Sequence, residues 1–158
     1  MRVVIDCNVL IAANRRETTV SLPCAAACAS QLQLIVDNEV LLEDTTNLIW
    51  EEYKRYCNFS GQPGSGDLFF LWFVRNRWTP ERVQRIDIGA NEDEIEAGVP
   101  ETLRAFDRSD RKWIVTYIRG AGQALYNALD SDWSESATVI CEAGINVVEL
   151  CQEDLRQR

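Results

Sequence analysis

Short apolar runs alternate with segments of helical spacing in the first third of the chain. Residues 3–5 are a continuous apolar run of the kind that forms a strand covered on both faces. From 22 to 36 the apolar residues recur every three or four positions and Pro23 falls in the first turn, which predicts a helix. A second strand is predicted at 40–42, followed by a helix that Thr45 or Thr46 caps and that runs to about Cys57.

The rest of the chain continues this alternation. Residues 60–66 are rich in Gly, Ser and Pro and predict a loop, and an acidic loop is predicted to end at Pro100. The helices expected here are an apolar one from Asp67 through Trp72 and Val74, a turn opened by Pro80, one starting at Pro100, one capped by Asp107 or Ser109 and ending near Gly120, and one at 134–143. The expected strands are 83–88, 124–129 and 146–150.

Strands that alternate with helices predict a parallel sheet with helices on both faces. We therefore expect an α/β protein, a three-layer α/β/α sandwich with a short central parallel sheet. A length of 158 residues fits one domain, residues 1–158. Ligands of such sheets bind beyond the carboxyl ends of the strands, and Asp6 and Asp130 each follow a predicted strand.

The composition restricts the chemistry. Histidine is absent, which excludes Ser-His-Asp and Cys-His catalysis in their usual forms, so hydrolysis would rely on carboxylates with metal. The net charge of −9 is unusual for a nucleic-acid enzyme, but six acids and no base lie between 86 and 103, which leaves −3 for the remaining chain. This balance speaks against broad non-specific binding of nucleic acid.

Targeting signals and cysteines add two expectations. No apolar stretch approaches the ~20 residues that span a bilayer, and Asp6 interrupts the first apolar run, so we predict a cytoplasmic protein without membrane contact. The six cysteines include no Cys-x-x-Cys pair, which disfavours a zinc site. Disulfide frameworks are typical of short secreted chains, so we expect buried thiols that pack as small hydrophobes.

Four acids are candidates for catalysis and metal binding. Asp6 directly follows a buried strand, where an unpaired carboxylate is costly; the alternative is an aspartate that caps the following helix. Glu52 shares a helix face with Leu48, Ile49 and Tyr56 and should point to the edge of the core, whereas Glu51 should face water. The alternative for Glu52 is a structural salt bridge to an arginine.

The other two candidates lie in the second half of the chain. Asp110 falls in the first turn of its predicted helix, where an acid also has an ordinary role at the helix dipole. Asp130 and Asp132 leave a strand at a spacing that points them the same way, although such pairs also mark turns. Carboxylates gathered at one sheet edge favour Mg²⁺ or Mn²⁺, which prefer hard oxygen ligands.

The ordered set of motifs resembles that of PIN-domain proteins (PilT N-terminus-like and VapC-like ribonucleases) over nearly the whole chain. Residues 3–13 resemble the family's opening, where an Asp-x-Asn-Val-Leu run ends the first strand. Residues 50–53 resemble its helix glutamate, 106–112 its third acidic motif and 130–133 its fourth. Many members have Thr or Ser where this chain has Ala128, and the segment 60–101 is longer than in compact toxin members.

The resemblance implies a Mg²⁺- or Mn²⁺-dependent endoribonuclease, frequently the toxin of a toxin–antitoxin pair. By position, Asp6, Glu52, Asp110 and Asp130 would be catalytic metal ligands, Asp132 an additional ligand and Asn8 a support for Asp6. Expected partners are single-stranded RNA and an antitoxin protein, with a homodimer as one open oligomeric state. The densest basic group provides the candidates for phosphate contacts: Arg75, Arg77, Arg82 and Arg85.

Two other functions are compatible with parts of the sequence. A phosphatase of the haloacid-dehalogenase class also has Asp after its first strand, but it needs a second Asp two residues later as general acid, where this chain has Asn8. A non-catalytic PIN-like module that binds protein or RNA would suit the acidic charge and the aromatic helix around Trp72, although burial of that helix is the simpler interpretation. Such a module would have no use for convergent carboxylates that repel one another without a cation.

Overall fold

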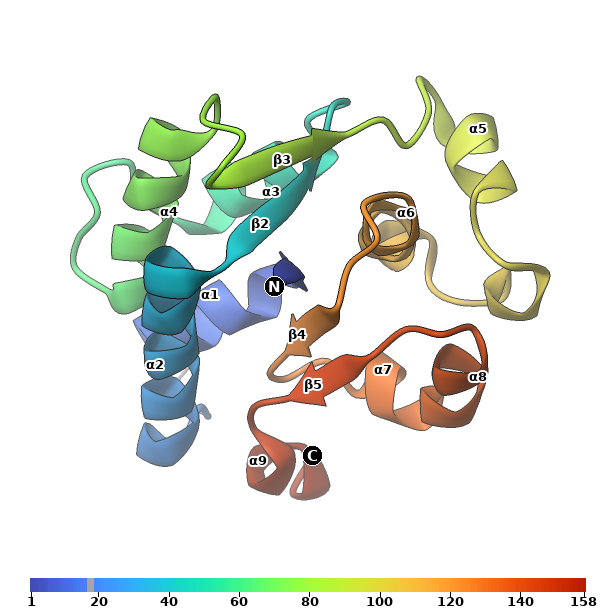
Figure 1. The fold of residues 1–158 in the computed structure, drawn as a ribbon. Coiled ribbons are helices and arrows are strands. Elements are labelled where there is room, and N and C mark those ends of the chain that lie inside the picture. Colours follow the sequence, from blue (N-terminus) through green and yellow to red (C-terminus); the bar gives the residue numbers. More distant parts are fainter. Residues whose placement is uncertain (17–18) are drawn as a thin grey trace.

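A central parallel sheet organises the chain. The structure is a computed structural model that describes residues 1–16 and 19–158. The described residues form a five-stranded sheet in the order β3-β2-β1-β4-β5, and every strand pair is parallel (Figure 1). The predicted α/β class is therefore confirmed. The strands are β1 (Arg2–Ile5), β2 (Val40–Asp44), β3 (Val83–Ile86), β4 (Ala124–Asn127) and β5 (Val147–Glu149).

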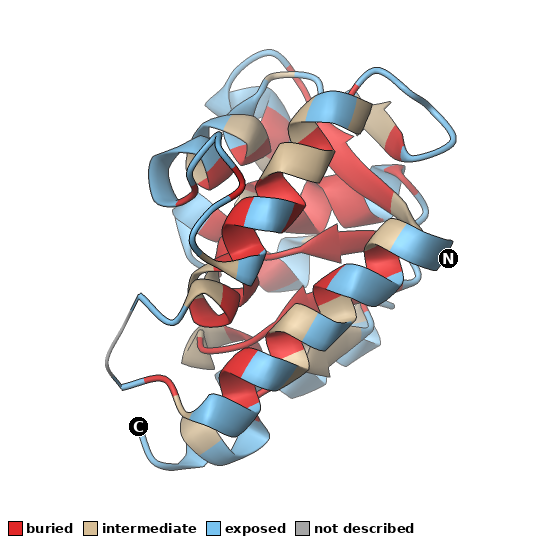
Figure 2. Cartoon of the chain, turned by 90° about the vertical axis from the view of Figure 1, so that its left-hand side faces the viewer, coloured by how far each residue is buried: buried red, intermediate tan, exposed pale blue. Residues whose placement is uncertain are grey.

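Helices cover both faces of this sheet and make three layers. On one side α1 (Cys7–Asn14), α2 (Leu22–Asn38) and α4 (Ser65–Asn76) pack against one another, and on the other α6 (Arg111–Arg119) packs on β1, β2 and β4 (Figure 1). Buried residues make up most of β1, β2 and β4 and the inner faces of the helices, while outer helix faces are exposed (Figure 2). This is the three-layer arrangement that the alternation of strands and helices predicts.

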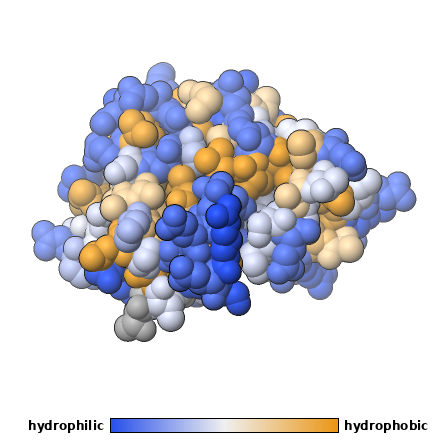
Figure 3. Space-filling model, turned by 90° about the horizontal axis from the view of Figure 1, so that it is seen from below, coloured by the Kyte–Doolittle hydropathy of each residue, from blue (hydrophilic) through white to orange (hydrophobic). Residues whose placement is uncertain are grey.

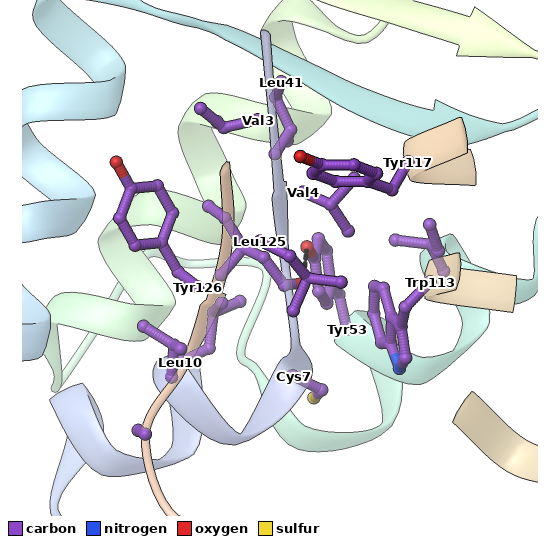
Figure 4. Packing of buried hydrophobic residues seen from close by; sticks show 14 of the residues in the cluster. Val3, Val4, Cys7, Leu10, Leu41, Tyr53, Trp113, Tyr117, Leu125 and Tyr126 are labelled. Carbon is purple, nitrogen blue, oxygen red and sulfur yellow. Dashed lines mark hydrogen bonds between the residues drawn. The ribbon is translucent and has the colours of Figure 1, made fainter. Parts of the chain in front are cut away.

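The core fixes the elements that carry the candidate acids. The Tyr53 hydroxyl, from α3 (Leu48–Tyr56), donates a hydrogen bond of 2.6 Å to the Ile5 carbonyl at the end of β1. Trp113 of α6 stacks on the Tyr53 ring at 5.9 Å with an interplanar angle of 28°. Figure 4 shows these two rings together beside β1, with Tyr126 on the other side of that strand. Helices α3 and α6 are thus held beside the carboxyl end of β1.

The predicted acidic loop is wrong in part, because it contains the helix α5 (Glu92–Ala97). The Asn91 side chain caps this helix by accepting a hydrogen bond of 3.0 Å from the Glu94 amide. Three acids in its first turn are favourably placed at the helix N-terminus. Sequence periodicity could not reveal so short a helix, since the cap and the dipole stabilise it more than an apolar face does.

Several other boundaries differ from the prediction. The helix expected at Pro100 is only the 3₁₀ turn η1 (Glu101–Leu103), and Pro80 lies in a turn rather than a helix. The helix expected at 134–143 is two short helices that meet at Ser136, α7 (Ser131–Glu135) and α8 (Ala137–Glu142). The remaining elements are η2 (Arg108–Asp110), which precedes α6, and the closing helix α9 (Gln152–Arg156).

Two expectations about buried side chains have opposite outcomes. The aromatic helix α4 buries Phe69, Phe70 and Phe73, which confirms the simpler interpretation of that helix. The prediction of free thiols is wrong for Cys24 and Cys151, which form a disulfide across 127 residues of sequence. Residues so far apart in sequence meet only because β5 returns the chain to the start of α2, and spacing could not predict that.

The face of the molecule drawn in Figure 3 carries both hydrophilic and hydrophobic side chains. Seen from below, hydrophobic side chains form separate patches between hydrophilic ones, and a strongly hydrophilic ridge crosses the middle (Figure 3). Among the described residues, no helix combines the length and the apolar character needed to cross a membrane.

Candidate metal centre

Three of the predicted acids meet at one edge of the sheet. Asp6 follows β1, Asp130 follows β4 and Asp110 immediately precedes α6. One carboxylate oxygen from each lies within 4.8 Å of the others. β1 and β4 are parallel neighbours, so their carboxyl ends lie side by side, and α6 brings its N-terminus to the same edge.

Asp6 caps the helix α1 and also belongs to this cluster, so its role as a cap does not exclude a place in the cluster. Its Oδ1 accepts a hydrogen bond of 3.2 Å from the Asn8 amide at the start of α1. Its Oδ2 accepts one of 2.9 Å from the indole Nε1 of Trp133, which is 1% exposed. Sequence reasoning included Trp133 in the fourth motif without assigning its side chain a role; an aromatic residue within an acidic motif was the available signal.

The negative charge of the cluster is compensated in part by Lys112, whose charge lowers the pKa of Asp110. Burial, together with the charges of Glu52 and Asp130, raises the pKa of Asp6 to about 7. Burial and the charges of Asp6 and Asp130 raise the pKa of Asp110 to about 8, and burial also raises the pKa of Asp130. Among the described residues, no ion pair involves any of these three acids. Near neutral pH these carboxylates therefore oppose one another's ionisation.

A second trio of acids shares Asp110 with the first. Oxygens of Asp107, Asp110 and Asp132 also lie within 4.8 Å of one another. Asp132 thus lies with Asp107 rather than as a fourth member of the Asp6 group. Asp107 was predicted only as a helix cap, and it does accept a hydrogen bond of 2.8 Å from the Ser109 amide, which lowers its pKa. Its exposed carboxylate adds a ligand position that the sequence analysis missed.

Glu52 lies beside the first trio but is paired with a base. Its Oε2 is 2.5 Å from Nζ of Lys112, whose side chain is 9% exposed. This pair matches the alternative interpretation of Glu52, a structural salt bridge, except that the base is a lysine and not an arginine. The apolar face of α3 was also misplaced: Ile49 and Tyr53 are buried, whereas Leu48 and Tyr56 are 41% and 39% exposed. Glu51 faces water, as predicted, and pairs with Lys54 at 3.5 Å.

Asn8 supports Asp130 rather than Asp6 with its side chain. Its Nδ2 donates to Oδ1 of Asn127 at 2.8 Å, and its Oδ1 accepts from the Ala128 amide at 2.7 Å. Asn127 in turn donates to the Asp130 carbonyl at 2.8 Å and to Glu149 at 2.6 Å. Asn127 is fully buried and fixes the end of β4 where Ala128 offers no hydroxyl. No sequence pattern pointed to Asn127 or Glu149.

The four arginines predicted as phosphate contacts do not form one patch at the centre. Arg77 and Arg85 are both paired with the buried Glu43, at 2.8 and 3.1 Å. Arg82 donates to the Val36 carbonyl, and Arg75 lines a groove between α2 and α4. Arg77, Arg82 and Arg85 therefore make separate structural contacts.

Other basic residues border the centre instead. A groove of about 470 Å³ beside Asp107 is lined partly by Arg108, Arg111 and Lys112. Two acids of α5 pair with these arginines, Glu92 with Arg108 at 2.5 Å and Glu96 with Arg111 at 3.7 Å. Part of the acidity of the 86–103 segment is therefore neutralised next to the candidate centre.

The donor set fits a hard divalent cation. All donors of both trios are carboxylate oxygens, which suit Mg²⁺ or Mn²⁺ better than softer metals. Burial is the main cause of the raised pKa values of Asp6 and Asp110, and the charges of neighbouring acids add to it, so positive charge at this place would favour the ionised carboxylates. The residues present are thus compatible with the cation that the sequence analysis expects.

Comparison with known proteins adds one likeness. No protein-family model and no curated protein matches the chain. Among solved structures it is similar to "Crystal structure of VapBC2 from Rickettsia felis bound to a DNA fragment from their promoter", with a TM-score of 0.48 and 12% identity over 94% of this chain and 98% of that chain. A likeness of this degree carries no argument about activity, so the function has to be argued from the site itself.

Proposed function

We propose that the chain is a Mg²⁺- or Mn²⁺-dependent endoribonuclease of the PIN type that hydrolyses phosphodiester bonds of single-stranded RNA. The observation that carries the proposal is the convergence of Asp6, Asp110 and Asp130 without a basic partner among the described residues. Acids that serve stability are normally paired, because an unpaired buried carboxylate is costly. The ordered motifs of the sequence support the same activity.

In this proposal Asp6, Asp110 and Asp130 hold one cation, and Asp107, Asp110 and Asp132 provide for a second. A bound divalent cation supplies positive charge to the phosphodiester and lowers the pKa of a water molecule. Trp133 and the Asn8–Asn127 pair orient the carboxylates of Asp6 and the main chain of Asp130. These supports keep the acids in place before a cation binds.

The bases beside the centre would contact the substrate. Arg108 and Arg111 line the adjoining groove and can exchange their glutamate partners for phosphates. Lys112 adds a buried positive charge between Glu52 and the trio. Because only these few basic side chains border the centre, they can make few phosphate contacts, and we expect a shallow salt dependence of RNA binding.

The test is cleavage of an end-labelled single-stranded RNA in Mn²⁺, in Mg²⁺ and in a chelator, with duplex RNA and single-stranded DNA as competitors. Asp130→Asn should be inactive, while Asp37→Asn, which changes an exposed acid on α2, should match wild type. Equal activity in chelator, or in Asp130→Asn, would exclude this mechanism. RNA binding without cleavage by wild type in both metals would instead favour the non-catalytic module.

The toxin role and the antitoxin partner that the resemblance implies extend the proposal. Expression of the chain alone in a bacterial host should slow growth, and Asp130→Asn should remove that effect. Normal growth with active wild-type protein in the cell would separate the ribonuclease from the toxin role.

A further inference from the structure

Three cysteine sulfurs meet where the C-terminal segment crosses α2. Cys24 and Cys28 lie one turn apart on α2, and Cys151 lies between β5 and α9. Cys24 and Cys151 are joined as a disulfide, and the free Sγ of Cys28 is 3.7 Å from that of Cys151. All three are at most 4% exposed, and their sulfurs lie within 4.8 Å of one another.

The third thiol has no part in a disulfide, yet it is placed against one. Cys28 belongs to the hydrophobic core, and within that core its sulfur is also in contact with the sulfur of Cys151. In tetrahedral zinc thiolates a Zn–S bond of ~2.3 Å puts neighbouring sulfurs ~3.8 Å apart. The Cys28–Cys151 separation of 3.7 Å equals such an edge. Positions 24 and 28 direct both α2 sulfurs to the same helix face, which provides the third corner.

We propose that Cys24, Cys28 and Cys151 form a thiolate site for Zn²⁺ or a similar soft cation, which loads when the disulfide is reduced. A dithiol or phosphine reductant delivers two electrons, and with two protons the bond between Cys24 and Cys151 becomes two thiols. Binding of the cation then displaces the protons of the three thiols to solvent. Water takes the fourth position, because the nearby Asp154 carboxylate accepts hydrogen bonds of 2.9 and 2.6 Å from the amide and hydroxyl of Ser21.

Both states of this cluster tie the C-terminal segment to α2. Two residues before Cys151, Glu149 accepts the 2.6 Å hydrogen bond from Asn127 that supports the end of β4. The tie therefore holds the outermost strand, β5, against the part of the sheet that carries Asp130. The thiolate site uses none of the carboxylates of the candidate metal centre and does not depend on ribonuclease activity.

Cobalt(II) titration of the phosphine-reduced protein tests this inference, since only thiolate ligation produces an intense sulfur-to-cobalt charge-transfer band. We expect the band to saturate at one equivalent, to disappear on addition of Zn²⁺ and to be absent from the oxidised protein. Cys28→Ser should weaken the band, because only two thiolates remain, while still forming the Cys24–Cys151 disulfide under oxidising conditions. The matched control is Cys57→Ser, which changes a buried free thiol outside the cluster and should keep the band.

Absence of the band from reduced wild type would overturn the inference, as would an undiminished band in Cys28→Ser. If Cys28→Ser does not fold, the comparison of oxidised and reduced wild type decides, because a thiolate site that includes Cys24 and Cys151 cannot form while they are bonded. Cobalt bound only by carboxylates gives no such band, and that result would count against the thiolate site without affecting the proposed ribonuclease.

Discussion

Two groups of carboxylates at the same edge of the sheet have opposite surroundings. Glu43, near the end of β2, is fully buried and is contacted by the guanidinium groups of Arg77 and Arg85. Asp6, Asp110 and Asp130, at the ends of β1 and β4 and the start of α6, are contacted by one another. Burial alone therefore does not distinguish a structural acid from a candidate ligand; a direct ion pair with a base does.

The two arginines that pair with Glu43 are themselves held by further contacts. Arg77 stacks over Trp50 at 4.4 Å, and Arg85 donates to Oδ1 of Asn47 at 2.9 Å. Burial raises the pKa of Glu43, and the hydrogen bond and charge of Arg77 oppose that rise. In the other group the neighbouring charges of Asp6 and Asp130 add to the rise at Asp110. Glu43 is thus paired directly with bases, whereas the acids of the other group raise one another's pKa.

The largest expected effect is on catalysis. Asp110 belongs to both trios, so Asp110→Asn should lower Mn²⁺-dependent cleavage by the several kcal/mol that metal ions supply to charged transition states, on the order of 10³-fold. Without divalent ions the variant should unfold at the same temperature as wild type or higher, because it removes a repelled charge. Rate assays on RNA and thermal melts in chelator measure the two parts. Retained activity, or a marked loss of stability in chelator, would place Asp110 with the structural acids.

Glu43→Gln should show the reverse. It leaves two guanidinium groups beside a neutral amide, and breaking a buried pair typically costs ~3–5 kcal/mol. Urea unfolding should detect this loss, while the rate of cleavage by the folded variant stays near that of wild type. Asp37→Asn, on the exposed side of α2, is the control for loss of an acid and should change neither quantity. A Glu43→Gln variant as stable as wild type would mean that the two groups do not differ as described.

The sequence predicted the elements that create this edge better than the partners that surround it. The end of β1 at Ile5 and the presence of β4 follow from apolar runs, although β4 ends at Asn127 rather than at 129. The parallel order follows from the alternation with helices. Glu43 was missed because it lies within an apolar strand and its partners come from α4 and β3. Lys112 was missed although it is two residues from Asp110, because only the packing of α6 against α3 brings it to Glu52. Long-range pairing of this kind leaves no periodic signal.

Divalent ions should stabilise the protein by binding to the group of Asp6, Asp110 and Asp130, and they should have no effect through the Glu43 group. A cation that binds only the folded state adds ~2.7 kcal/mol at a concentration of 100 times its Kd. For a chain of this size, that corresponds to a rise of ~5–10 °C in Tm. Asp6→Asn should reduce the increment and Glu43→Gln should keep it. An unchanged Tm of wild type at millimolar Mn²⁺ would contradict the cation site.

The pH dependence of the metal-free protein follows from the same charges. The folded-state pKa values of Asp6 and Asp110 are raised to about 7 and about 8, above those of an unfolded chain. Between the ordinary aspartate value of 3.8 and these raised values the two groups bind more protons in the folded state than in the unfolded state. Their contribution to stability should therefore be highest at acidic pH and fall as pH rises toward 8, by at most ~1.4 kcal/mol per pH unit for each group. Thermal melts in chelator from pH 5 to 8 measure this slope, and Asp110→Asn should flatten it.

The smallest effects separate the two adjacent glutamates of α3. Glu52 is paired with Lys112 beside the trio, so Glu52→Gln would free that lysine and disturb the charge next to Asp6. Loss of a supporting interaction of this kind costs ~10–100-fold in activity or metal affinity. Glu51 is exposed and pairs with Lys54 across one helical turn, where such pairs contribute only ~0.2–0.5 kcal/mol. Glu51→Gln should therefore leave both activity and Tm near those of wild type.

Equal losses in the two variants would show that α3 acts through its overall charge rather than through the Glu52–Lys112 pair. If Glu52→Gln lost as much activity as Asp110→Asn, Glu52 would instead be a ligand of the cation. Lys112 would then move aside when the cation binds.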